Sequence, residues 1–231
     1  MKPIIILVAP QLGENIGAAA RAMKNFDLEE MRIINPRDGW PNPKADSMSV
    51  GAIDIIQKAK IYNNLPEAIK DLEYLYATTG QMRDMNKNYV TAKDLANKYP
   101  RKIKTGIMFG RENCGLTNEE ISYANSILTI ETTPEFSSLN IAHSVAVIGH
   151  SLFKSQNRTD LSNEQKLCTM EELEYFFEHL FTELDKRNFF KIPEKYPQMS
   201  QNIRNLFMRV DKLSHNEMQT LRGIVSCLSD R

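Results

Sequence analysis

The 231-residue sequence contains few cysteines, no long apolar run and no excess of either charge. Its three cysteines, Cys114, Cys168 and Cys227, are far apart and form no CxxC pair. An odd, scattered set fits reduced thiols in the cytoplasm better than disulfides or a zinc site. The histidines also lack ligand spacing to cysteines or carboxylates, so we expect no metal. The apolar run Ile4–Val8 is too short for a signal peptide or a membrane span, and we therefore expect a cytoplasmic protein without membrane contact.

Charge is balanced, with 29 basic and 29 acidic residues, so no overall basic field indicates a nucleic-acid partner. A local basic face on a neutral protein can still bind phosphates. Hydrophobic residues make up 42% of the chain and charged residues 25%, which is typical of a soluble globular protein.

Short β-rich runs alternate with helical patterns through the first two thirds of the chain. Strands are expected at residues 4–8, 31–35, 74–79, 105–110 and 126–130. Helices are expected at residues 15–26, 47–58, 65–72, 92–99, 118–123 and 139–153. Because the strand runs are apolar on both faces and alternate with helices, the sequence predicts an α/β fold with a parallel sheet.

Beyond Phe153 the pattern changes to a polar stretch and then to helices. We expect a first domain at residues 1–155, a linker at 156–168 and a small α-helical C-terminal extension at 169–231.

Capping boxes are expected to begin two helices of the extension, at Thr169 with Glu172 and at Ser214 with Glu217. Apolar residues follow each box at helical spacing. The two stripes are Leu173, Phe176, Phe177, Leu180, Phe181 and Leu184, and Met218, Leu221, Ile224, Val225 and Leu228. Since so few helices cannot bury such stripes alone, we expect them to pack against each other and against a second subunit.

Ligands in open parallel sheets bind beyond the carboxyl ends of the strands, and three glycine-containing loops fall there. The first, APQLGENIGAAARAM, follows the strand at 4–8 and opens a helix. Gly13 and Gly17 are four residues apart, and the absence of a GxGxxG triplet and of a Walker A lysine disfavours a dinucleotide or nucleoside-triphosphate site. Asn15 is the expected N-cap of this helix. Arg21 is either a surface arginine or a residue that reaches the mouth of the sheet.

The second loop, IMFGRENCGLTNEE, contains Glu112 in a turn and a capping box of Thr117 with Glu120. Glu112 could orient a cationic group or be a solvated turn residue, and the pattern leaves both open. The third loop, PEFSSLN, precedes a helix for which Ser138 is the expected N-cap. Taken alone, this last pattern favours a cap over chemistry.

Together the stretches NIGAAARAM, FGRENCGL and FSSLNIA resemble the three ordered motifs of the SpoU/TrmH-type SPOUT methyltransferases. With ATTGQMR and the tail RNLFMRVDKLSHNEMQTLRGIVSCL, the chain resembles the TrmJ branch of that family over nearly its whole length. The resemblance implies a parallel sheet with a deep carboxyl-terminal trefoil knot, which connection rules alone would argue against. It also implies S-adenosyl-L-methionine (SAM) as cofactor, S-adenosyl-L-homocysteine as product, a homodimer and no metal.

By the same resemblance, Arg21 is the main catalytic residue, acting on a ribose 2′-hydroxyl either as a base or by positioning it. The residues implied in catalysis are Arg21, Ser138, Asn140, Asn15 and Glu112, with Asn15 and Glu112 holding Arg21 and the pocket in place. Those implied in cofactor contact are Thr79, Gly80, Phe109, Gly110, Glu112, Gly115, Ile130, Ser138 and Leu139. Those implied in RNA contact are Arg21, Arg83 and Arg111.

The expected function is tRNA ribose 2′-O-methylation in the anticodon loop, at nucleotide 32 and on cytidine or uridine. Methylation of ribosomal RNA is the close alternative. The distant alternatives are a SAM- or RNA-binding knotted protein without activity and a nicotinamide enzyme. Such a substrate requires a basic face on this neutral chain. Its candidates are Arg32, Arg37 and Lys44 beside Trp40, then Arg101, Lys102 and Lys104, and in the tail Lys186, Arg187, Lys191, Arg204 and Arg209.

Overall fold

A computed structural model describes residues 1–80, 86–154, 167–209 and 213–229. At its centre lies a seven-stranded sheet with the order β3-β2-β1-β6-β4-β7-β5. Every strand pair is parallel, which confirms the predicted α/β fold with a parallel sheet. The strands are β1 (Ile4–Val8), β2 (Met31–Ile34), β3 (Lys60–Tyr62), β4 (Tyr74–Thr78), β5 (Asn88–Thr91), β6 (Thr105–Phe109) and β7 (Ser126–Thr129).

Helices follow most of the strands and continue in the tail. In the first part of the chain they are α1 (Gly13–Asn25), α2 (Pro43–Met48), α3 (Ile53–Lys58), α4 (Leu65–Ile69), α5 (Ala92–Lys98), α6 (Asn118–Ser122) and α7 (Ile141–Phe153). In the tail they are α8 (Met170–Lys186), the 3₁₀ turn η1 (Pro193–Lys195), α9 (Tyr196–Met208) and α10 (His215–Ser229).

The sequence prediction missed two edge strands, and it joined two separate helices into one. β3 and β5 form the two edges of the sheet, where strands are short and partly exposed, so they lack the apolar run by which a buried strand is recognised. The helix expected at 47–58 is divided into α2 and α3 around Gly51, whose φ of +79° is a left-handed conformation that ends a helix.

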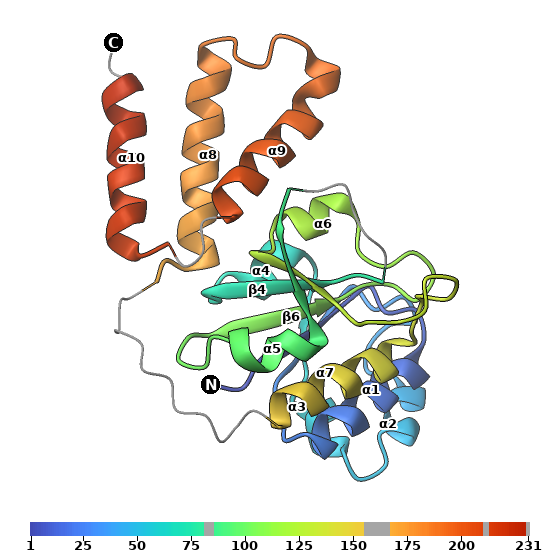
Figure 1. Ribbon diagram of the computed structural model, residues 1–231. Coiled ribbons are helices and arrows are strands. Elements are labelled where there is room, and N and C mark those ends of the chain that lie inside the picture. The colour runs from blue at the N-terminus through green and yellow to red at the C-terminus, as the bar shows by residue number, and fades with distance from the viewer. Residues whose placement is uncertain (81–85, 155–166, 210–212, 230–231) are drawn as a thin grey trace.

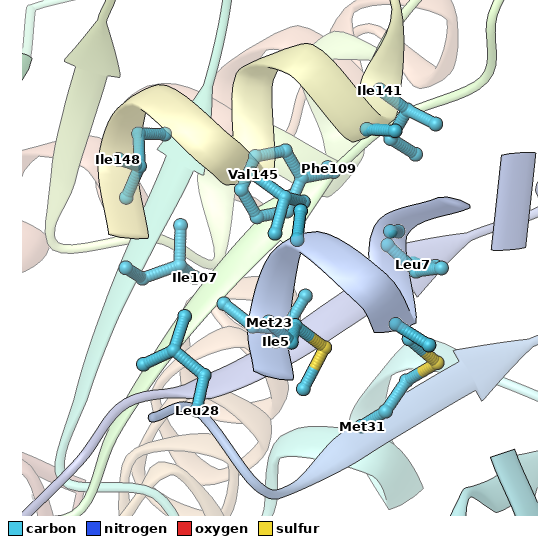
Figure 2. Packing of buried hydrophobic residues seen from close by; sticks show 14 of the residues in the cluster. Ile5, Leu7, Met23, Leu28, Met31, Ile107, Phe109, Ile141, Val145 and Ile148 are labelled. Carbon is cyan, nitrogen blue, oxygen red and sulfur yellow. The ribbon is translucent and has the colours of Figure 1, made fainter. Parts of the chain in front are cut away.

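Alternate residues of β1 enter two different hydrophobic cores. Ile5 and Leu7 pack with α1, α3 and α7 on one face of the sheet, whereas Ile4 and Ile6 pack with α4, α6 and α8 on the other. The first layer lies below the sheet in Figure 1, and Figure 2 shows Ile5 and Leu7 in its packing. Because both faces are covered, every residue of β1 is buried, which explains its unbroken apolar sequence.

The first helix of the tail completes the second core. Leu173, Phe176 and Phe177 of α8 are buried in the cluster that covers the sheet, and the backbone N–H of Met170 donates to Leu72 O at 2.8 Å. The expectation that the tail helices pack against each other is confirmed, since α8 contacts α10 and its Phe176 and Phe177 lie against Phe207 of α9. α8 also packs on α4, so the sheet domain covers part of the stripe. The predicted capping box of Thr169 is present.

Four neighbouring strands, β1, β6, β4 and β7, end at the same edge of the sheet. Since they are parallel, the loops that follow them meet above that edge. These loops are the segments at 9–12, 110–116, 79–80 and 130–140. All three loops singled out from the sequence are thus brought together.

Candidate active site

A cavity of about 350 Å³ lies where the loops after β4, β6 and β7 meet. Its walls are Thr78, Thr79, Gly80, Phe109, Gly110, Arg111, Glu112, Asn113, Cys114, Gly115, Leu116, Leu128, Ile130, Ser137, Ser138, Leu139, Ile141 and Ser144. All nine positions expected to contact a cofactor are among them. The lining residues that the sequence prediction missed are mostly direct chain neighbours of predicted ones, so widening each motif by a residue or two would have found most of them.

Glycines give the cavity its tight backbone. A Cβ on Gly110 would lie 2.2 Å from the carbonyl carbon of Gly115, so no side chain fits there. Gly115 has a φ of +69°, and its N–H and C=O both pair with Arg111 across the turn, at 2.8 and 3.2 Å. On the opposite wall, a Cβ on Gly80 would lie 2.8 Å from Ser137 O. Backbone groups therefore approach the cavity from both sides.

A chain of hydrogen bonds joins three loops beside the cavity. Asn15 Nδ2 donates to Glu112 Oε1 at 2.9 Å, and Asn140 Nδ2 donates to Asn15 Oδ1 at 2.9 Å. The second carboxylate oxygen of Glu112 accepts from the backbone N–H of Gln11 at 2.8 Å. Asn15 of the first motif is thus bound to one residue of each of the other two motifs.

The caps of the two helices beside the cavity differ from those predicted. Asn15 lies within the first turn of α1, which begins after Leu12 without a side-chain cap. Glu112 instead accepts from the N–H groups before this helix, and a carboxylate at a helix N-terminus is stabilised by the helix dipole. Asn140, not Ser138, caps α7, because its Oδ1 accepts from Ala142 N at 2.8 Å.

The correct cap of α7 was available in the sequence, because asparagine directly before an apolar helical run is a strong N-cap signal. Ser138 lies two residues earlier and lines the cavity. The side chain expected to cap is therefore free for contact with a ligand.

Arg21 is exposed on α1 and is not among the residues that line the cavity. It makes no hydrogen bond or ion pair with the part of the chain that the structure describes. Glu112 and Asn15 bind each other rather than Arg21, and Glu112 also accepts from the N–H groups that precede α1. Within one chain, the arginine and the cavity remain separate.

Arg111, which was also expected to contact RNA, is bound within its own chain. Arg111 makes a bidentate ion pair with Glu120 at 2.9 and 3.0 Å, which raises the pKa of its guanidinium. Because Glu120 also completes the capping box of α6 with Thr117, this arginine fastens its loop to that helix. Arg83 lies outside the described residues.

Two basic residues were wrongly assigned to an RNA-facing surface. Arg32 is 1% exposed and is bound to Asp71 at 2.6 Å, so its guanidinium belongs to the second core. Arg204 is bound to Glu174 by two hydrogen bonds at 2.5 and 2.9 Å and lies over the ring of Phe177 at 4.6 Å. Both guanidinium groups are thus paired with a carboxylate of their own chain, and that of Arg32 is too buried to reach a phosphate.

Metal ligands do not cluster in the described ranges: no group of three or more His, Cys, Asp or Glu side chains is placed to hold an ion there. Among the helices described, none combines the length and apolarity required to cross a membrane.

Comparison with known proteins places this geometry in a family. Residues 2–150 match the SpoU rRNA Methylase family, and residues 171–231 match the C-terminal domain of the tRNA methyltransferase TrmJ. The tRNA (cytidine-2′-O-)-methyltransferase TrmJ of Methanocaldococcus jannaschii is 34% identical over 222 residues, covering 94% of this chain and 95% of the relative. The tRNA (cytidine/uridine-2′-O-)-methyltransferase TrmJ of Photorhabdus laumondii is 31% identical, covering 96% and 94%.

Among solved structures, TrmJ from Z. mobilis ZM4 superposes with a TM-score of 0.91 at 38% identity, covering 99% of both chains. Similarity of sequence and of fold therefore extends over both the sheet domain and the tail. The chain belongs to the SpoU methylase family, in the TrmJ branch of that family.

Proposed function

We propose that this protein is a SAM-dependent tRNA ribose 2′-O-methyltransferase that acts on cytidine or uridine at nucleotide 32 of the anticodon loop. The observation that carries the proposal is the hydrogen-bonded chain from Glu112 through Asn15 to Asn140, which closes three motif loops beside one cavity. The names of the TrmJ relatives support tRNA as the substrate class.

The cavity fits SAM. Its volume of about 350 Å³ falls in the range of small-molecule pockets. Apolar side chains of Phe109, Leu128 and Ile130 offer walls for an adenine ring, and the close backbone at Gly110 and Gly80 offers peptide N–H and C=O groups for its polar edges. When bound there, SAM supplies the methyl group.

The ribose oxygen takes the methyl from the SAM sulfur and its proton leaves to water or to the neighbouring RNA phosphate, so this chain's own residues have to align the hydroxyl. We assign the alignment to Arg21, because a guanidinium keeps its proton but can hold ribose and phosphate through forked hydrogen bonds. Ser138 is exposed at the cavity wall, where its hydroxyl can bind the reacting groups. Asn140 and Asn15 keep this wall in register with α1.

A homodimer is part of the proposal. Its support is that Arg21 lies away from the cavity of its own chain, while apolar side chains before and on α7 remain exposed, namely Phe136, Leu139 and Val147. Light scattering on the purified protein tests it, and a monomer at micromolar concentration would contradict it.

We also retain the trefoil knot, the cytoplasmic location and the domain division at 1–155, 156–168 and 169–231 as parts of the proposal. The knot is supported by the course of the chain after β7, which passes against Gly80 of the β4 loop before entering α7. The two family models, which end at 150 and begin at 171, support the division.

Transfer of labelled methyl from SAM to purified tRNA and ribosomal RNA tests the function, followed by mapping of the modified nucleotide. We expect label in tRNA at a ribose 2′-oxygen. Ribosomal RNA is the alternative because the matched family model is described by rRNA methylation. Label confined to ribosomal RNA would replace the proposal with that alternative.

A further inference from the structure

A buried lysine binds the end of a helix behind the cavity. Lys87, just before β5, is 7% exposed, and its Nζ donates to Ser122 O at 3.0 Å and to Ala124 O at 2.5 Å. These carbonyls lie at the carboxyl end of α6, where helix carbonyls lack intrahelical partners. The Lys87 Nζ therefore satisfies carbonyls that would otherwise be buried without a partner. Lys87 thereby ties the connection between β4 and β5 to α6.

The tail reaches the same junction from its other side. Arg209, just after α9, donates from Nη1 to Asn86 Oδ1 at 2.8 Å, next to Lys87 in sequence. Arg204 of α9 lies over the ring of Tyr123, the C-cap residue of α6, at 5.0 Å. α9 and α6 are neighbours in space, as Figure 1 shows. The tail therefore contacts both partners that Lys87 joins.

From this junction α6 leads directly to the cavity. The two hydrogen bonds between Glu120 and Arg111 fasten α6 to the loop at 110–116, and Arg111 closes the turn of that loop with Gly115. Gly110 and Gly115 line the cavity. A displacement of α6 would consequently move the backbone groups that face the ligand.

We propose that Lys87 is a positioning residue for the cofactor: it fixes α6, and through the Arg111–Glu120 pair the 110–116 loop, while α9 of the tail stabilises this arrangement. The inference rests on the proposed function in taking SAM as the ligand. It gives the tail a task at the cofactor cavity, separate from any contact with RNA.

The test is Lys87→Met, which keeps the length and the apolar stem of the side chain but removes both hydrogen bonds. We expect the SAM dissociation constant and the KM for SAM to rise about tenfold, with the KM for tRNA unchanged. In the ligand-free protein, amide exchange of the peptide covering residues 106–116 should become faster. Ile56→Ala, a buried change in α3 on the opposite face of the sheet, is the control for general destabilisation.

An unchanged SAM affinity in Lys87→Met would overturn the inference, as would an equal loss in Ile56→Ala. If Lys87→Met does not fold, Asn86→Ala, Arg209→Ala and the double variant decide. We expect each single change to weaken SAM binding about threefold and the double change no more than either, because one bond is removed in all three. Additive losses of SAM affinity in the double variant, or no loss in any of the three, would contradict the proposed contact between the tail and the Lys87 junction.

The proposed function and the role of Lys87 are tested by different measurements. If the wild-type protein does not bind SAM, the proposed function is wrong, whereas amide exchange at 106–116 still decides whether Lys87 positions the loop.

Discussion

Asn15 and Glu112 are 97 residues apart in sequence, yet Asn15 Nδ2 donates to Glu112 Oε1 at 2.9 Å. The contact joins the first turn of α1 to the loop after β6 and exists because β1 and β6 are adjacent parallel strands. It makes the helix that carries Arg21 and the loop that lines the cavity parts of one hydrogen-bonded unit.

Glu112→Gln should lower methyl transfer by about tenfold or more. The variant amide has only one acceptor oxygen, so either Asn15 Nδ2 or the N–H of Gln11 loses its partner, and a lost partner at a partly buried site costs about 1–3 kcal/mol. Steady-state kinetics with SAM and tRNA measure the effect. Glu119→Gln, an exposed change in α6, is the matched control, and equal activity of the two variants would contradict the prediction.

Arg21→Ala should abolish methyl transfer while SAM binding is retained, because Arg21 does not line the cavity. Arg21→Lys should restore little activity, since an ammonium cannot make the forked contact. Calorimetry and labelled-methyl transfer separate the two effects. Arg222→Ala, which removes an exposed arginine on α10, serves as control. Near-normal turnover of Arg21→Ala would remove this residue from the mechanism.

Gly110→Ala should prevent SAM binding, because the added methyl would lie 2.2 Å from the backbone of Gly115 and the turn would have to open. Gly223→Ala in the middle of α10 meets no atom within 4 Å and should stabilise the protein by up to about 1 kcal/mol. Melting temperatures and SAM titrations of the two variants check both expectations. SAM binding by Gly110→Ala at wild-type affinity would show that the turn does not form the cavity wall.

Stability should rise with pH between about pH 7 and pH 10 because of Lys87. Burial, and then the charge of Arg204, lower the pKa of Lys87 to about 7 from its usual 10.5. Between these values the unfolded chain binds the extra proton, so the free energy of unfolding increases as pH rises. Urea denaturation at several pH values measures the slope, and Lys87→Met should flatten it. A slope unchanged by that substitution would mean that another group titrates.

Asp71→Asn should destabilise the protein by about 2 kcal/mol, because it leaves the buried Arg32 guanidinium with a weaker partner. Although burial acts to raise the pKa of Asp71, hydrogen bonds from Arg32 and Lys104 hold it well below its usual value. The stability that this pair supplies is present above pH 4 and should be lost progressively as pH falls below about 4. Denaturation at neutral and acidic pH tests both parts, with the exposed Glu67→Gln as control.

The sequence predicted best what local chemistry determines. The unbroken apolar run of β1 indicated a strand buried on both faces, and the boxes at Thr117 and Thr169 marked helix starts that the structure confirms. The motif loops were expected at the carboxyl edge of the sheet, and they meet there around the cavity.

The features that could not be predicted from the sequence depend on residues that are far apart in the chain and meet only in the fold. Nothing in the sequence around Arg32 distinguishes it from a surface arginine. It can be buried because Asp71, 39 residues away in sequence, pairs with its guanidinium. Asn15 matched the local pattern of an N-cap, but the N-terminus of α1 is bound by the carboxylate of Glu112, which accepts from Leu12 N and Asn15 Nδ2. The edge strand β5 is defined by its pairing with β7 rather than by its own residues.

The position of β6 between β1 and β4 has a consequence for folding. This strand joins the two halves of the sheet, and the loop at its end forms one wall of the cavity. A partly folded chain without β6 has neither a continuous sheet nor a binding site, so completing the fold and creating the site are one event. A ligand held in the cavity then stabilises the whole sheet by mass action, so the rise in melting temperature with ligand concentration reports the affinity of the site.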